Sequence, residues 1–276
     1  SGTPGWMLTL QETAEEWLKM LPESLHSMQR SPDSIKNPLF RFHERESTIM
    51  SKLLKQVRSD LESVQKVCTG ELKQTNYLRG LIETLIKGTV PKDWGKYKVP
   101  RTLAVNAWVI DFIERIKQAE TIIAWVNGGK DLRRIHLSLS YLLVPEAYFT
   151  ATRQAVAQAH KWSLEQLSME LDVVHSERPL TDCEFMCTRL RFEGAMADGT
   201  TLNLVDETSK VAPLCVLRWV NTADGDNHGK QMVNIPIYLN ATREDLLTTV
   251  PFRPGGGRDE NEFYQLGVAI CCSALS

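Results

Sequence analysis

The apolar residues change their period once along the chain, at about Ser168, and this change separates two kinds of predicted structure. From Leu8 to about Leu167 they recur at every third or fourth position, which is the spacing of an amphipathic helix. After Ser168 they recur at every second position, as in a strand with one buried face. The sequence therefore predicts the α+β class, with an N-terminal helical subdomain followed by a small antiparallel β barrel or roll.

Four helices are predicted in the helical part. The second is an amphipathic helix of about six turns, and its apolar stripe comprises Phe42, Ile49, Leu53, Val57, Leu61, Val64 and Val67. A shorter helix ends at Pro22, a third covers about 72–87 and stops at Gly88, and a fourth covers about 103–126. Residues 131–144 alternate like a strand but continue into an apolar run, so their structure stays open.

The β part is predicted to follow a helix that bridges it to the helical part, and Pro145 suits the first residue of that helix. Candidate strands cover 169–174, 184–192, 201–205, 214–220, 232–239, 246–252 and 264–272, with turn clusters at 197–199, 224–227 and 254–257. The run 211–220 is apolar on both faces and is therefore placed at the centre. We predict a helical subdomain at 1–144, a bridging helix at 145–167 and a β subdomain at 168–276.

The charge is nearly balanced, with 32 basic and 34 acidic residues and a formal net charge of −2. Nucleic-acid-binding proteins usually carry a basic excess or stripe, so the sequence argues against a nucleic-acid partner. No apolar run approaches the roughly 20 residues of a membrane helix, which argues against membrane insertion. The sequence starts without Met and without a signal sequence, so we expect a piece of a longer cytoplasmic protein.

The six cysteines are interpreted as reduced, mostly buried thiols of a cytosolic protein. Cys183 and Cys187 have three residues between them rather than the two of zinc knuckles, and no pair of histidines lies nearby in the sequence. We therefore predict no metal site.

The sequence contains no recognisable catalytic or cofactor-binding motif. The loop 253–258 is rich in glycine, but it lacks the Lys-Ser/Thr ending of a phosphate-binding loop, and Asp259 and Glu260 follow it. His43-Glu44 resembles the start of a zinc-helix motif, but Ser47 stands where the second histidine is required. We therefore predict a flexible loop at 253–258 and a protein that is not an enzyme, with no catalytic, cofactor-binding or metal residues.

Seven tryptophans are many for a protein of 276 residues. The period assigns three of them to the core, namely Trp108, Trp125 and Trp219. Three others lie near the ends of segments, where large aromatic side chains often anchor interfaces. We therefore take Trp6, Trp17 and Trp94 as candidate interaction residues.

Whole phrases of the sequence resemble one known family. They include Asn37-Pro38-Leu39-Phe40-Arg41-Phe42, Gln74-Thr75-Asn76-Tyr77-Leu78-Arg79, Lys87-Gly88-Thr89-Val90-Pro91, Val144-Pro145-Glu146-Ala147-Tyr148, Thr150-Ala151-Thr152-Arg153-Gln154 and Gly267-Val268-Ala269-Ile270-Cys271. Over nearly all of its length the sequence resembles the C-terminal region of dynein heavy chains. The phrases at 145–148 and 150–154 resemble the cytoplasmic rather than the axonemal class. Departures lie mainly in the loops 176–182, 221–230 and 253–262.

The resemblance implies a function that composition and periodicity do not show. In this family the domain follows the last AAA+ module of the motor ring and lies on one face of the ring. It neither binds nor hydrolyses ATP, and the parent motor binds microtubules elsewhere. The resemblance thus implies a non-catalytic cap, without a cofactor, that contacts the AAA+ ring modules of the same heavy chain. Such a cap modulates processivity and force in minus-end-directed transport, in the cytoplasm and on microtubules.

Two other interpretations stay open at this point. The first is a stand-alone helical-plus-β protein-interaction module, which is expected to expose a large apolar patch. The second is an enzyme with an unrecognised site, which is expected to hold titratable groups with shifted pKa values in a pocket.

Overall fold

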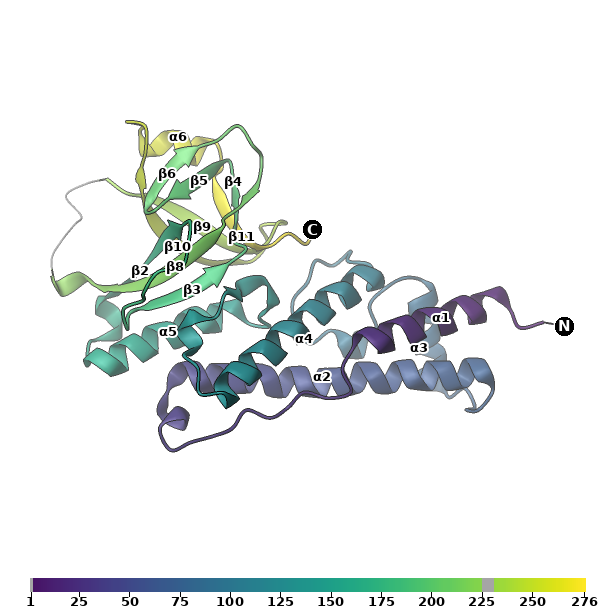
Figure 1. The fold of residues 1–276 in the computed structure, drawn as a ribbon. Helices are drawn as coiled ribbons and strands as arrows, with labels where there is room; N and C mark the ends of the chain where they lie inside the picture. The colour runs from purple at the N-terminus through teal and green to yellow at the C-terminus, as the bar shows by residue number, and fades with distance from the viewer. Residues whose placement is uncertain (1, 225–230) are drawn as a thin grey trace. The chain divides into compact units, whose positions relative to one another are not determined.

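A computed structural model describes residues 2–224 and 231–276 of the protein (Figure 1). Contacts divide the protein into two compact units. The first, which we call the helical unit, comprises Ser1–Gln29 and Glu44–Asn127. The second, which we call the β-rich unit, comprises Arg30–His43 and Gly128–Ser276. Part of the predicted turn cluster at 224–227 lies outside the described residues.

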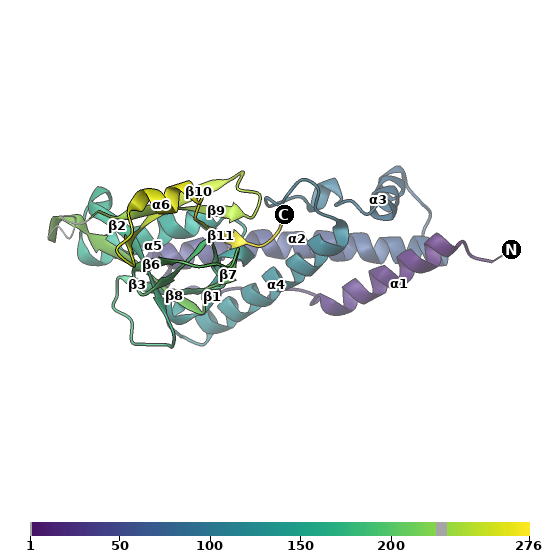
Figure 2. The ribbon, with the colours of Figure 1, turned by 90° about the horizontal axis from the view of Figure 1, so that it is seen from above.

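The helical unit is built from α1 (Gly5–Met20), α2 (Pro38–Thr69), α3 (Asn76–Ile86) and α4 (Val105–Asn127), and the first turn and a half of α2 belongs to the β-rich unit. The predicted apolar stripe of α2 is buried except for Ile49, which is 41% exposed, and Val57, Leu61 and Val64 are completely buried. Thr75 caps α3, because its hydroxyl accepts a hydrogen bond of 3.2 Å from the Leu78 amide. Figure 2 shows α1 and α3 beside the half of α2 that ends at Thr69.

The four-stranded sheet of the β-rich unit has the order β1-β3-β8-β2. Its strands are β1 (Leu137–Ser138), β2 (Leu167–Val174), β3 (Glu184–Thr188) and β8 (Leu214–Asn221). The central position predicted for the run 211–220 is confirmed, because β8 lies between β3 and β2. Helix α5 (Pro145–His160) packs against this sheet (Figure 1), and the Trp219 indole donates a hydrogen bond of 2.8 Å to the Thr152 hydroxyl.

The seven-stranded sheet has the order β5-β6-β10-β9-β11-β4-β7. Its strands are β4 (Arg191–Glu193), β5 (Ala195–Asp198), β6 (Thr201–Leu204), β7 (Lys210–Val211), β9 (Val233–Asn240), β10 (Leu246–Pro254) and β11 (Ala269–Ser273). A short helix, α6 (Glu260–Gln265), separates β10 from β11. The connecting 3₁₀ turns are Ser34–Lys36, Lys92–Trp94, Leu132–Arg134, Leu139–Tyr141, Leu164–Gln166 and Thr222–Asp224.

The α+β class is confirmed, but the prediction of an antiparallel barrel or roll needs correction. Both sheets are mixed, with parallel pairs β1–β3, β10–β6 and β11–β9. Within the described residues neither sheet closes into a barrel. The physical reason lies partly in α6, because it turns the backbone after β10 so that β11 returns beside β9 in the same direction as β9.

Two predicted strands differ from the observed strands by more than two residues. The predicted strand 184–192 is two strands in different sheets, and it breaks at Arg189, whose φ is 62°. The predicted strand 264–272 starts later, at Ala269, because residues up to Gln265 form α6. In the open segment 131–144, only Leu137–Ser138 forms a strand, β1, and it lies between the 3₁₀ turns Leu132–Arg134 and Leu139–Tyr141.

The two compact units do not coincide with the predicted ranges 1–144, 145–167 and 168–276, because each unit combines two separate segments of the sequence. Residues 128–144 and the predicted bridging helix belong to the β-rich unit, together with Arg30–His43. In the part of the protein that the structure describes, no helix combines the length and the apolar character needed to cross a membrane.

Candidate functional site

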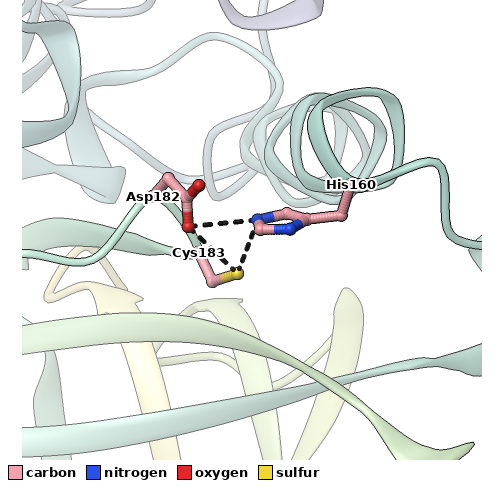
Figure 3. Close-up of side chains that lie close together, drawn as sticks. All are labelled: His160, Asp182 and Cys183. Atoms are coloured by element: carbon pink, nitrogen blue, oxygen red, sulfur yellow. Dashed lines mark hydrogen bonds and ion pairs between the residues drawn. The ribbon is translucent and has the colours of Figure 1, made fainter.

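Three side chains with metal-ligating or acid–base chemistry meet in the β-rich unit, and we call them the His–Asp–Cys cluster: His160, Asp182 and Cys183 (Figure 3). His160 Nε2 lies 3.0 Å from Asp182 Oδ1 and 3.4 Å from Cys183 Sγ. The third side of this triangle, from Cys183 Sγ to Asp182 Oδ1, measures 3.7 Å. Elsewhere among the described residues no other group of three such ligands lies this close together.

Helix α5 ends at the point where it presents His160. Lys161 follows in the left-handed conformation, with φ of 57°, and its amide donates to the Ala157 carbonyl, so the helix stops there. The imidazole of His160 stacks on the Trp162 ring, with centroids 4.1 Å apart and an interplanar angle of 14°. This stacking fixes the plane of the imidazole ring.

Asp182 and Cys183 occupy the tight turn that leads into β3. The Glu184 amide donates to the Thr181 carbonyl at 3.2 Å, which closes the turn around both residues. The Cys183 carbonyl accepts a hydrogen bond of 3.1 Å from the Trp219 amide on β8. The backbone of the turn is therefore anchored to the four-stranded sheet.

A network of charges holds the far side of this turn, and we call it the Glu184 network: Glu170, Asp172, Arg178, Glu184 and Arg218. The Glu184 side chain is 3% exposed and lies 2.6 Å from Arg178 Nη2 and 3.1 Å from Arg218 Nη2. Its Oε1 also accepts a hydrogen bond of 2.9 Å from the Thr181 amide. Hydrogen bonding to Arg178, above all, lowers the pKa of Glu184 to about 2.

The His–Asp–Cys cluster does not have the arrangement of a nucleophilic triad. In a triad the base uses one ring nitrogen for the nucleophile and the other for the orienting carboxylate. Here Asp182 and Cys183 both approach the same nitrogen, Nε2 of His160. Burial, followed by the charge of Asp182, raises the pKa of the Cys183 thiol to about 11. A reactive cysteine needs a lowered pKa, so the cluster does not present an activated thiolate.

The three candidate interaction residues lie in different environments. Trp94 is completely buried, and its indole donates a hydrogen bond of 2.8 Å to Asp60 Oδ2. Trp17 is 8% exposed, on the buried face of α1. Trp6 is 44% exposed, on the first turn of α1. As the helical unit stands, only Trp6 of the three offers a large surface to a partner.

In the glycine-rich segment 253–258, the structure explains why one position, Gly255, is a glycine. The Gly255 amide donates to the Leu202 carbonyl at 2.8 Å, and a Cβ atom on Gly255 would lie only 2.1 Å from Asn203 Oδ1. A glycine fits best here, because any Cβ atom would displace the Asn203 side chain and lie 3.0 Å from the Leu202 carbonyl oxygen.

Sequence reasoning missed the His–Asp–Cys cluster. It considered Cys183 only together with Cys187, which is completely buried in β3 and lies opposite Cys215 on β8. His160 is 23 residues away from Cys183 in the sequence. The one available signal was the position of Cys183 directly before the candidate strand 184–192, since His160 lies within the predicted bridging helix 145–167.

The fold belongs to the α+β class, and the His–Asp–Cys cluster is not arranged as a nucleophilic triad. Comparisons with known proteins identify the family. The family model for the C-terminal domain of dynein heavy chains matches residues 4–272. The protein therefore belongs to the family of C-terminal domains of dynein heavy chains.

The relatives agree with this assignment. The sequence is 38% identical, over 276 residues, to the cytoplasmic dynein heavy chain of Drosophila melanogaster, covering 99% of this chain. It is 37% identical, over 273 residues, to that of Caenorhabditis elegans, covering 98% of this chain. To human dynein axonemal heavy chain 9 it is 27% identical over 177 residues. The predicted resemblance to cytoplasmic dynein heavy chains is confirmed. The sequence spans about 6% of the length of the cytoplasmic relatives.

Proposed function

We propose that this protein is a non-catalytic cap of a dynein heavy chain, which packs on the AAA+ ring of the same heavy chain. There it modulates processivity and force while the motor moves toward microtubule minus ends. The observation that carries the proposal is the match to the dynein C-terminal domain over residues 4–272, together with the identity to cytoplasmic heavy chains. The cytoplasm and the microtubule cytoskeleton are the corresponding location.

In this proposal ATP and microtubules are bound by the parent motor and not by residues 1–276 themselves. The sequence supports this division of roles, because its glycine-rich segment lacks the lysine and hydroxyl residue of a phosphate-binding loop. The thiol of the His–Asp–Cys cluster, with its raised pKa, also gives no support to nucleophilic chemistry.

A cap without catalytic groups acts by favouring some conformations of the ring over others. Its effect is limited by the difference in its contact free energy between those conformations. A difference of about 1.4 kcal/mol changes the ratio of two conformations tenfold. Contacts of this size require only a few anchoring side chains, and Trp6 is our candidate for one of them because it is a large, exposed aromatic residue.

The test compares the parent motor with and without residues 1–276 in single-molecule motility and optical-trap assays. We expect changed run length and stall force. Unchanged values for both would contradict a modulating role. The contribution of Trp6 is tested in the same motor with Trp6→Ala, and the matched control is Ile110→Ala, which removes another exposed apolar side chain of the helical unit. A change in run length is expected only for Trp6→Ala.

A further inference from the structure

We propose that His160, Asp182 and Cys183 form a binding site for a divalent ion of the Zn²⁺ type. The three ligand atoms belong to three different chemical groups, an imidazole nitrogen, a carboxylate oxygen and a sulfur, and all lie within 4.8 Å of one another. They come from the end of α5 and from the turn before β3, and Figure 3 shows the three side chains directed toward one another.

The separations match those of three corners of a tetrahedral zinc site. Zinc–ligand bonds of about 2.0–2.3 Å at tetrahedral angles place neighbouring ligand atoms about 3.3–3.6 Å apart. The observed separations are 3.0 Å for nitrogen to oxygen, 3.4 Å for sulfur to nitrogen and 3.7 Å for sulfur to oxygen. Adjustments of a few tenths of an ångström therefore suffice for one ion to contact all three atoms.

Hydrogen bonds link the three groups before any ion binds. The Cys183 thiol donates to Asp182 Oδ1, and Asp182 and Cys183 both lie beside Nε2 of His160, the nitrogen that a metal ion would use. A metal ion lies between all three atoms and binds each through a lone pair. On binding, the proton of the neutral imidazole resides on Nδ1, so that Nε2 offers its lone pair, and the thiol releases its proton to the solvent and becomes the thiolate ligand.

The ligand types select the class of ion. Mg²⁺ and Ca²⁺ prefer oxygen ligands, whereas a set of sulfur, imidazole and carboxylate suits Zn²⁺ and its spectroscopic substitute Co²⁺. Three protein ligands leave one tetrahedral position for water or for a group from a partner. Asp182 is 64% exposed at its side chain, so an ion reaches the site directly from solvent.

The surroundings hold the ligands in place before any ion binds. His160 is stacked on Trp162, and the turn of Asp182 and Cys183 is closed by its own hydrogen bond and anchored to β8. The C-terminal end of α5 adds the negative end of a helix dipole, which favours a cation. The Arg133 guanidinium donates to the Thr181 carbonyl, which places a positive charge near the site and disfavours a cation. Its pairing with Asp131 at 2.8 Å reduces this repulsion.

Cobalt provides the direct test, with residues 1–276 prepared without an affinity tag that binds metals. We expect one Co²⁺ per molecule, a near-ultraviolet band of sulfur-to-cobalt charge transfer, and loss of that band when Zn²⁺ is added. Cys183→Ser should remove the band. His160→Gln and Asp182→Asn should keep the fold and weaken binding by at least about tenfold.

Two control variants distinguish this site from other metal contacts. Cys68→Ser removes a half-buried thiol elsewhere, and His175→Gln removes the histidine of another His–Asp pair, in which His175 Nε2 lies 3.4 Å from Asp198 Oδ1. Both controls should keep the band and the affinity. The proposal is overturned if no band forms at saturating Co²⁺, or if a band forms and survives Cys183→Ser. Circular dichroism checks that each variant is folded.

Discussion

The helical unit and the β-rich unit each bury a carboxylate, and they stabilise it in different ways. Asp60 of the helical unit is 4% exposed and accepts hydrogen bonds from uncharged donors, the Trp94 indole, the Tyr77 hydroxyl and the Gln56 amide. Glu184 of the β-rich unit is instead held by the guanidinium groups of Arg178 and Arg218. Neutral hydrogen-bond donors, two of them aromatic side chains, therefore stabilise the buried Asp60 side chain, whereas two positively charged arginines stabilise Glu184.

The difference predicts which substitutions destabilise each unit. The helical unit should lose stability when a neutral donor to Asp60 is removed or when the packing of that donor changes. The β-rich unit loses stability when the Glu184 charge is removed, because Arg178 and Arg218 each lose one of their carboxylate partners. Asp172 remains beside both arginines. A buried ion pair in the helical unit, in which Arg115 Nε lies 2.7 Å from Asp111 Oδ2, is likewise covered by an aromatic ring, that of Tyr97.

The largest expected effect is that of Glu184→Gln. The substitution keeps the shape of the side chain but removes the charge between two arginines, so we expect the free energy of unfolding to fall by about 3 kcal/mol. Urea denaturation measures this change. The matched control is Glu262→Gln, which removes an exposed pair with Arg258 and should cost less than about 0.5 kcal/mol. Equal effects of the two variants would contradict the claim that the buried Glu184 pairs stabilise the protein more than the exposed pair does.

Acid should weaken the β-rich unit through two groups. Glu184 has its pKa lowered from 4.5 to about 2, so its stabilisation is complete above 4.5 and is lost as the pH falls toward 2. Burial lowers the pKa of His43 from 6.5 to about 3, so protonation favours the unfolded state below pH 6.5. Each group contributes a loss of about 1.4 kcal/mol per pH unit within its window.

Urea denaturation of wild type and Glu184→Gln between pH 7 and pH 3 measures the Glu184 part. The gap in stability between the two proteins should stay constant down to about pH 4.5 and then shrink. A gap that does not depend on pH would show that the carboxylate charge of Glu184 is not what stabilises the unit.

Trp94→Phe should have a smaller effect in the helical unit. It removes the hydrogen bond of 2.8 Å to Asp60 but leaves Tyr77 and Gln56 as donors, so we expect a loss of about 2 kcal/mol. Thermal unfolding measures it, with Trp6→Phe at an exposed position as the control. A loss no larger than that of the control would mean that the indole hydrogen bond contributes nothing to stability.

The smallest effects come from one glycine in each unit, and they should have opposite signs. Gly80 lies within α3 with open space around its Cα, so Gly80→Ala should stabilise the protein by about 0.5–1 kcal/mol. Gly255 approaches Asn203 and Leu202 too closely for a Cβ atom, so Gly255→Ala should destabilise it by about 1 kcal/mol. Melting temperatures report both, and the same sign for the two variants would contradict the structural reason given for Gly255.

Much of the fold could be predicted because it follows from local patterns. The stripe of α2, the stop at Gly88 and the first residue of α5 at Pro145 all depend on residues within a few turns of each other. The sheet order could not be predicted in this way, because pairs such as β11 with β9 join distant segments. The break at Arg189 and the helix α6 were missed because alternating apolar residues continue across both.

The candidate sites depended even more on distant contacts. Trp94 lies between charged residues near the end of a segment, which is typical of a surface position, and only the contact with Asp60, 34 residues away, shows that it is a core residue. The His–Asp–Cys cluster forms because α5 and the turn before β3 meet after the backbone has passed through β2. The spacing of apolar residues along the sequence carries no information on contacts between such distant segments.

The measurement that tests the central claim most directly is the microtubule-stimulated ATPase rate of the parent heavy chain with and without residues 1–276. A non-catalytic cap predicts that ATP turnover is largely retained when these residues are removed, while run length or stall force changes. Complete loss of ATPase activity in a motor whose ring is still intact by electron microscopy would contradict the account, because it would place this domain within the catalytic cycle.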